Sequence, residues 1–143
     1  MKNINLFDNN YIDTLCPENN EFLWSIFNHF GYKNDDDPEV KKQTLLALKK
    51  MLDLDIIYVD EWIANPELEN HNLTTDKIIK HIDKIWFEGA KFPDLYGMVI
   101  FGTQKWYTEA LEKKGMTNTT NWKLFVKNKI GNLEQWIEDN RPK

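Results

Sequence analysis

Apolar residues recur every three or four positions over most of the chain, a spacing typical of amphipathic helices. The most regular segment follows Thr74 or Thr75, either of which can cap the first turn of a helix. The pattern predicts a helix that ends before Gly89 and buries one face. Its apolar positions are Ile78, Ile79, Ile82, Ile85 and Trp86, with Lys77, Lys80, His81, Asp83 and Lys84 expected to point outward.

A second long helix is predicted to begin at Pro38, with Asp37 as its N-cap, because proline suits the first helical position. Its expected buried stripe is Val40, Thr44, Leu45, Leu48, Met51 and Leu52. Four further patterns of helical spacing occur. They are Leu6 to Leu15, Phe22 to Phe30 before Gly31, Trp106 to Leu111 before Gly115, and Trp122 to Ile137, where Gly131 is expected to separate two short helices or break one.

Two short apolar runs are typical of β-strands. One is the β-branched run between Asp55 and Asp60, and the other is Met98 to Phe101, between two glycines. They are predicted to pair, although a two-stranded sheet must rest on helices to be stable. The patterns together predict a single domain over residues 1–143 that is mainly α (α+β), with a small two-stranded β element.

Length and composition fit one ordinary globular domain. The chain has 143 residues, of which 41% are hydrophobic and 29% are charged. Cys16 is the only cysteine, which excludes an internal disulfide and fits a reducing compartment. The first residues reach Asp8 without an apolar segment, and no stretch approaches the roughly 18 apolar residues of a membrane span. These features predict a cytoplasmic protein that has no membrane partner.

The charge is unevenly distributed between the two halves of the chain. Residues 1–76 carry 6 lysines and 15 acidic residues, and residues 77–143 carry 12 basic and 8 acidic residues. The net charges of the two parts are −9 and +4, and that of the whole chain is −5. A strongly acidic half argues against binding to nucleic acid, which requires a basic face. It suits a basic protein partner, because complementary charges speed encounter.

Known catalytic and metal-binding patterns are missing from the sequence. It contains no phosphate-binding loop, no GxGxxG and no HExxH, and its three histidines are far apart. The run Asp35-Asp36-Asp37 fails as a calcium loop because Pro38 and Glu39 follow it and no glycine stands at the sixth position. We therefore predict no catalytic residue, no metal and no cofactor, and a protein that is not an enzyme. An unrecognised site built on Cys16, a histidine or carboxylates stays an alternative.

The acidic half contains two clusters that could form a partner-binding surface. Solvated loop charge is the default explanation of each cluster, and Asp37 also suits a helix cap. Tyr58 and Trp62 lie among the acids, and an aromatic anchor within a charged ring is a common hot-spot arrangement, although Trp62 could also belong to the core. The predicted partner-binding residues are Asp35, Asp36, Asp37, Asp53, Asp55, Tyr58, Asp60, Glu61, Trp62, Glu67 and Glu69.

The passage from Thr44 to Trp62 also resembles the end of a winged-helix domain, with an amphipathic helix followed by a strand that would enter a wing. Such a helix would present Lys41, Lys42, Lys49 and Lys50 to a groove. Asp53 and Asp55 follow at once and make a poor phosphate-binding surface. A regulatory or protein-interaction module of this kind is the alternative function.

The second half of the chain, from Gly97 to Pro142, resembles small immunity proteins of bacterial polymorphic-toxin and contact-dependent growth-inhibition systems. The features that carry the resemblance are the pair Trp106-Tyr107 before an amphipathic helix and the tryptophans Trp122 and Trp136 of the closing segment. The resemblance implies a protein that binds and neutralises one cognate toxin, often a nuclease. It implies no interface residues, because no shared interface motif is present. A basic nuclease toxin would suit the acidic half of the chain.

Overall fold

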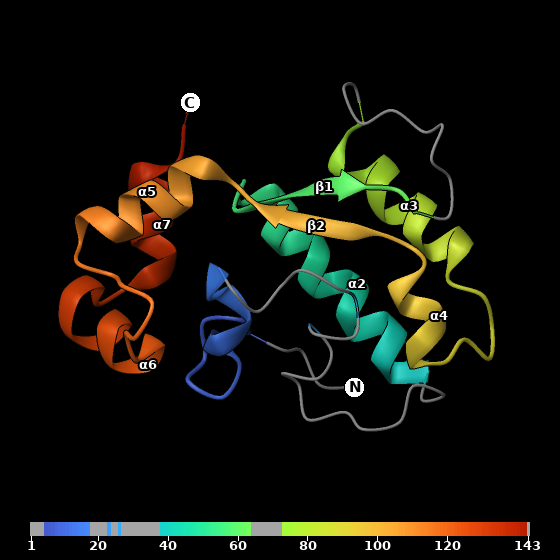
Figure 1. Ribbon diagram of the computed structural model, residues 1–143, viewed down its shortest axis with the longest axis horizontal. Coiled ribbons are helices and arrows are strands. Elements are labelled where there is room, and N and C mark those ends of the chain that lie inside the picture. The colour runs from blue at the N-terminus through green and yellow to red at the C-terminus, as the bar shows by residue number, and fades with distance from the viewer. Residues whose placement is uncertain (1–4, 18–22, 24–25, 27–37, 64–72, 143) are drawn as a thin grey trace.

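A computed structural model describes residues 5–17, 23, 26, 38–63 and 73–142. Helices dominate, and one antiparallel pair of strands crosses the middle of the described structure (Figure 1). The predicted fold class, mainly α with a two-stranded β element, is confirmed. The elements in order are the 3₁₀ helix η1 (Ile12–Leu15), α2 (Pro38–Asp53), β1 (Ile57–Glu61), α3 (Thr75–Ile85), α4 (Phe92–Tyr96), β2 (Ile100–Thr103), α5 (Lys105–Lys113), α6 (Trp122–Phe125), the π-helical turn η3 (Val126–Ile130) and α7 (Leu133–Asn140).

Helix α2 begins at Pro38, as its sequence predicts, and packs against α3. Its predicted stripe is buried except for Leu45, which is half-buried, and Gln43 and Ala47 join it. Lys41 connects the two helices at the end of α3. Its Nζ lies 2.9 Å from a carboxylate oxygen of Asp83 and donates to the carbonyl oxygens of Asp83 and Trp86. A lysine therefore satisfies carbonyls that the last turn of α3 leaves unpaired.

Helix α3 starts where its N-cap predicts. The Thr74 hydroxyl accepts a hydrogen bond from the Lys77 backbone N–H at 3.2 Å. One expectation on this helix is wrong, because His81 does not point into solvent. Its ring is half-buried and lies edge-on to Trp62, with ring centroids 4.8 Å apart. Packing against Trp62, the residue after β1, therefore occupies a position that the helical pattern assigned to the polar face.

The predicted pairing of the two strands is confirmed, with Ile57 opposite Thr103 and Val59 opposite Phe101. Strand β2 begins at Ile100, two residues later than its sequence predicts. The reason is the short helix α4, Phe92–Tyr96, which the hydrophobic pattern does not predict. The backbone N–H groups of Gly97 and Met98 still donate to carbonyls of α4, so neither residue can join the strand.

The last part of the chain forms a separate group of helices, α5 to α7, at one end of the structure (Figure 1). The predicted break near Gly131 is confirmed, because Gly131 has a φ of 85° and its N–H closes the π turn on the Val126 carbonyl. Two buried donors attach η1 to this group. The Tyr107 hydroxyl and the Trp122 Nε1 each donate at 2.8 Å, to the carbonyls of Leu15 and Ile12.

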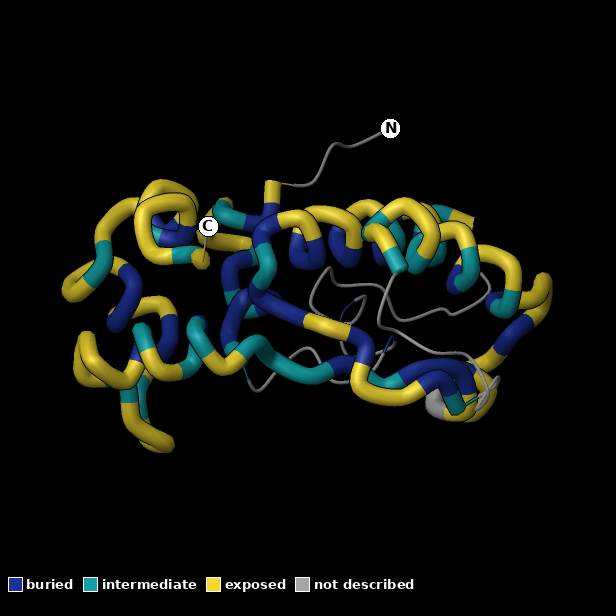
Figure 2. Tube along the Cα trace, turned by 90° about the horizontal axis from the view of Figure 1, so that it is seen from above, coloured by how far each residue is buried: buried dark blue, intermediate teal, exposed yellow. Residues whose placement is uncertain are grey.

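The buried apolar side chains of the described residues form one cluster that includes every helix from α2 to α7 and both strands. Figure 2 shows buried positions turned toward the interior and exposed positions on the outer sides of the helices. Leu23 and Ile26 are fully buried and helical, as the predicted segment from Phe22 to Phe30 requires. The other residues of that segment, and Gly31, lie outside the described residues.

Candidate protein-binding surface

Six of the predicted partner-binding residues lie in the described part of the chain, and all six lie in strand β1 or close to its ends. The remaining five, Asp35, Asp36, Asp37, Glu67 and Glu69, lie outside the described residues. The described six fall into three groups with different surroundings. Two acids precede the strand, one aromatic residue is buried after it, and Tyr58, Asp60 and Glu61 lie exposed along it.

The two acids before β1 are engaged within the chain. Lys49 Nζ lies 3.0 Å from an Asp53 carboxylate oxygen, and Arg141 Nη2 lies 3.4 Å from an Asp55 carboxylate oxygen. Arg141 Nη1 also donates to the Asp53 carbonyl at 2.9 Å. Asp55 has a φ of 59°, and its carbonyl accepts from Trp106 Nε1 at 2.6 Å. These acids and their partners hold a tight turn in place, a role that the sequence pattern did not reveal.

Trp62 is 2% exposed, so the prediction of an exposed aromatic anchor at this position is wrong. The cause is an irregularity in the strand pairing between Val59 and Glu61. It places Asp60 and Glu61 on the surface in succession and returns Trp62 to the core, where it contacts His81. A regular two-residue alternation from Tyr58 would have placed Trp62 on the exposed side.

Tyr58, Asp60 and Glu61 form what we call the β1 face. Tyr58 is 41% exposed, and its ring lies across Gly102 on the neighbouring strand. A Cβ at Gly102 would lie 2.5 Å from Tyr58 Cζ, so only glycine leaves room for the ring there. Asp60 and Glu61 are exposed, and neither forms an ion pair with another described residue. The face therefore combines a positioned aromatic ring with uncompensated negative charge.

A shallow hollow of about 300 Å³ adjoins the β1 face between β1 and the start of α3. Its walls are mostly aliphatic, and Tyr58 and Asp55 contribute the aromatic and acidic groups. An apolar side chain of a partner could enter this hollow beside the tyrosine ring. The lining residues are Leu52, Asp55, Ile57, Tyr58, Val59, Leu73, Thr75, Ile78 and Gln104.

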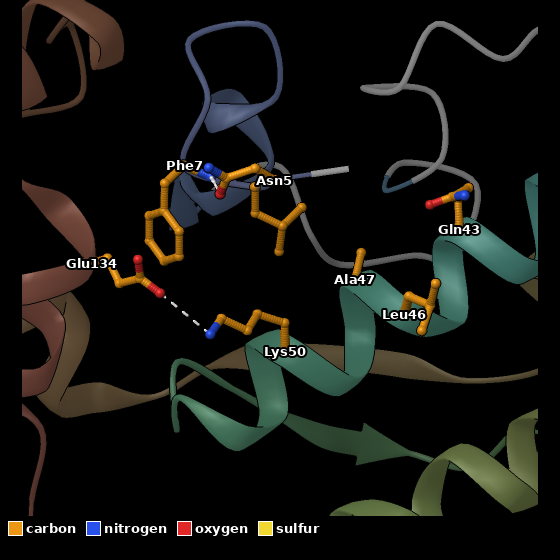
Figure 3. A pocket seen from close by; sticks show the side chains of 8 residues that line it. Asn5, Phe7, Gln43, Leu46, Ala47, Lys50 and Glu134 are labelled. Atoms are coloured by element: carbon orange, nitrogen blue, oxygen red, sulfur yellow. Dashed lines mark hydrogen bonds and ion pairs between the residues drawn. The ribbon is translucent and has the colours of Figure 1, made fainter. Parts of the chain in front are cut away.

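A second hollow, of about 320 Å³, separates the N-terminal segment from α2 (Figure 3). Lys50 and Glu134 point toward one another on its wall, with their charged atoms 3.3 Å apart, and Phe7 lies above them. Leu46, on its rim, is 51% exposed. The lining contains no cysteine, histidine or hydroxyl group, and its two ionisable side chains, Lys50 and Glu134, are paired with each other.

The described residues hold no group of three or more histidine, cysteine or acidic side chains that could bind a metal ion. Cys16 is buried, as expected of a small apolar residue in this position. Burial, and to a lesser degree the nearby Cys16, raises the pKa of Tyr107 well above its ordinary value. Tyr107 thus stays neutral and donates to the Leu15 carbonyl as a structural group.

Comparison of the chain with protein-family models, curated proteins and solved structures gives no significant match. Among the described residues, no helix has the length and apolar character needed to cross a membrane.

Proposed function

We propose that the chain is a binding protein that neutralises a basic protein partner, as an immunity protein neutralises its toxin. The observation that carries this proposal is the β1 face. Around strand β1, the acids before the strand are paired with Lys49 and Arg141, whereas Asp60 and Glu61 are exposed without an ion-pair partner among the described residues. Uncompensated charge beside an exposed tyrosine is a suitable arrangement for recognising a basic surface.

The β1 face would act by covering the partner's substrate-binding surface. Carboxylates attract a basic surface during encounter and raise the association rate. Tyr58 supplies a large apolar contact that loses little conformational freedom on binding, because its ring already rests on Gly102. A nuclease toxin would present basic groups that normally contact phosphates. Asp60 and Glu61 would form ion pairs with these groups in place of the phosphates.

The proposal is tested with the product of the gene immediately upstream. We expect that product to be toxic when expressed alone and harmless when co-expressed with this chain, and the two proteins to co-purify. The variant Asp60→Lys/Glu61→Lys should weaken binding at least about tenfold and reduce the salt dependence of the association rate. The matched control is Glu88→Lys/Glu112→Lys, which reverses two exposed acids away from β1. A non-toxic neighbour, or equal loss of binding in both variants, contradicts the proposal.

The winged-helix alternative receives no support from the described residues. A wing is a hairpin, but the partner of β1 is β2, and helices α3 and α4 come between the two strands in the chain. Lys41, Lys49 and Lys50 on α2 form ion pairs with acids of α3, α2 and α7, so their charge is compensated within the protein. Salt-sensitive binding to duplex DNA would be needed to favour this function.

A further inference from the structure

The group of helices at the C-terminal end contains an open hollow of about 420 Å³ between α5 and α7. Two tryptophans, Trp106 on α5 and Trp136 on α7, contribute its aromatic walls. Lys113 and Lys114 lie at the end of α5 on its rim. Ala110, Glu109 and Asn140 complete the lining, and all of these residues lie within the continuous described range 73–142.

The indole of Trp106 is held in place before any partner arrives, and that of Trp136 lies against Tyr107. Trp106 Nε1 donates to the Asp55 carbonyl at 2.6 Å, which fixes the orientation of its indole. Tyr107 contacts both tryptophans, with ring centroids 5.6 Å from Trp106 and 6.3 Å from Trp136. Each tryptophan is half-buried, so part of its surface faces the hollow. Rigid aromatic surface binds a partner with little loss of conformational entropy.

The charge beside the tryptophans is positive on balance, because two lysines and one glutamate line the hollow. Glu109 lies 3.7 Å from Lys105 Nζ and is engaged with it. Lys113 and Lys114 are exposed, and neither forms an ion pair with another described residue. This hollow therefore attracts negative charge, although the chain as a whole carries −5.

We propose that this hollow binds an acidic segment of a partner protein. An apolar side chain of the segment occupies the space between Trp106 and Trp136, and flanking carboxylates pair with Lys113 and Lys114. The hollow is open on its outer side, so it would enclose a small ligand poorly but can receive one side of a peptide. This interaction is distinct from that of the β1 face, which has the opposite charge, and does not depend on it.

The test uses the full chain labelled with 5-fluorotryptophan and observed by ¹⁹F NMR. The six tryptophan resonances are assigned with single Trp→Phe variants. The probe is a capped peptide Glu-Asp-Leu-Phe-Asp-Glu, and the matched control peptide is Gln-Asn-Leu-Phe-Asn-Gln. We expect the acidic peptide to shift the resonances of Trp106 and Trp136 and to leave those of the buried Trp62, Trp86 and Trp122 unchanged.

The lysines are tested by charge reversal. Lys113→Glu/Lys114→Glu should raise the Kd of the acidic peptide at least about tenfold, because two attractive pairs become repulsive. The control Lys77→Glu/Lys80→Glu, at two exposed lysines of α3, should leave the Kd within about twofold. Equal effects of both double variants overturn the proposal.

Four other results also overturn it. No shift at about 1 mM acidic peptide, or an equal response to the amide peptide, excludes charge-dependent binding of a segment. The same shifts with inorganic phosphate alone assign the hollow to small anions. Shifts that appear on raising the protein concentration without peptide assign it to a second copy of the chain.

Discussion

The two ends of strand β1 both carry acidic residues, but their carboxylates have different surroundings. Before the strand, Asp53 and Asp55 lie 3.0 and 3.4 Å from the cationic groups of Lys49 and Arg141. At the other end, Asp60 and Glu61 face solvent without an ion-pair partner among the described residues. The first pair contributes to the fold, and the second is available to a partner. A count of charges along the sequence cannot separate these roles.

The largest expected effect concerns the aromatic residues on the strand and just after it. Trp62→Ala should lower the free energy of unfolding by about 3–5 kcal/mol, because it removes a large buried side chain. Tyr58→Ala should cost about 1 kcal/mol or less, since its ring is partly exposed, but it should weaken partner binding. Urea denaturation followed by circular dichroism measures both. Similar losses of stability in the two variants would contradict the separation of core and surface roles.

Arg141→Ala tests the acids before the strand. The variant removes the ion pair to Asp55 and the hydrogen bond to the Asp53 carbonyl, both partly exposed to solvent, and we expect a loss of about 1 kcal/mol. Asp60→Asn/Glu61→Gln should change stability by no more than about 0.5 kcal/mol, because no pair is broken. Chemical denaturation at low and high salt gives both values. The comparison between the two ends fails if the second variant costs as much as the first.

Gly102→Ala tests whether Tyr58 is positioned by its neighbour. The new Cβ would collide with the far end of the tyrosine ring, which must move aside. Because that end of the side chain can swing away, we expect a change in stability below about 1 kcal/mol. The nuclear Overhauser contacts between the Tyr58 ring and residue 102 should be lost, and affinity for the partner should fall. An unmoved ring would show that Gly102 does not determine its position.

The smallest expected effect is a change in the pKa of Lys49. Hydrogen bonds to Asp53 and Asp76 raise the pKa of Lys49 above its ordinary value of 10.5. The charged form is favoured in the folded state, so this contribution to stability is fully present below pH 10.5 and is lost as the pH rises through the raised pKa. Asp53→Asn should lower the pKa of Lys49, as measured by ¹⁵N-detected NMR of its Nζ. An unchanged pKa would mean that the pair does not persist in solution.

Much of the fold follows from patterns that the sequence displays locally. The stripe from Val40 to Leu52 and the cap at Thr74 predict α2 and α3, and Gly131 predicts the break in the closing helices. Helix α4 was not predicted, because its five residues are too few to show a helical periodicity. The start of β2 was misplaced for the same reason, since the last turn of α4 uses Gly97 and Met98.

The candidate site was predicted less well than the fold. The sequence identified Tyr58, Asp60 and Glu61 as surface candidates, and all three are exposed. It also selected Trp62, which an irregular strand pairing buries, and two acids that hold a turn. The sequence did not predict the hollow between Trp106 and Trp136. Its walls come from two helices, α5 and α7, that are separated in the chain and meet only in the folded structure.

The sequence by itself determined the helical periodicity, the caps and breaks of the helices, the presence of two short strands and the unequal distribution of charge. These properties depend on the preferences of each residue and its near neighbours. Only the tertiary structure decided which acids are compensated and which aromatic residues are exposed. Arg141 reaches the Asp53 carbonyl from 88 positions away, and Trp106 reaches that of Asp55 from 51. The compensation of Asp55 and the burial of Trp62 depend on such distant contacts, which no local pattern records.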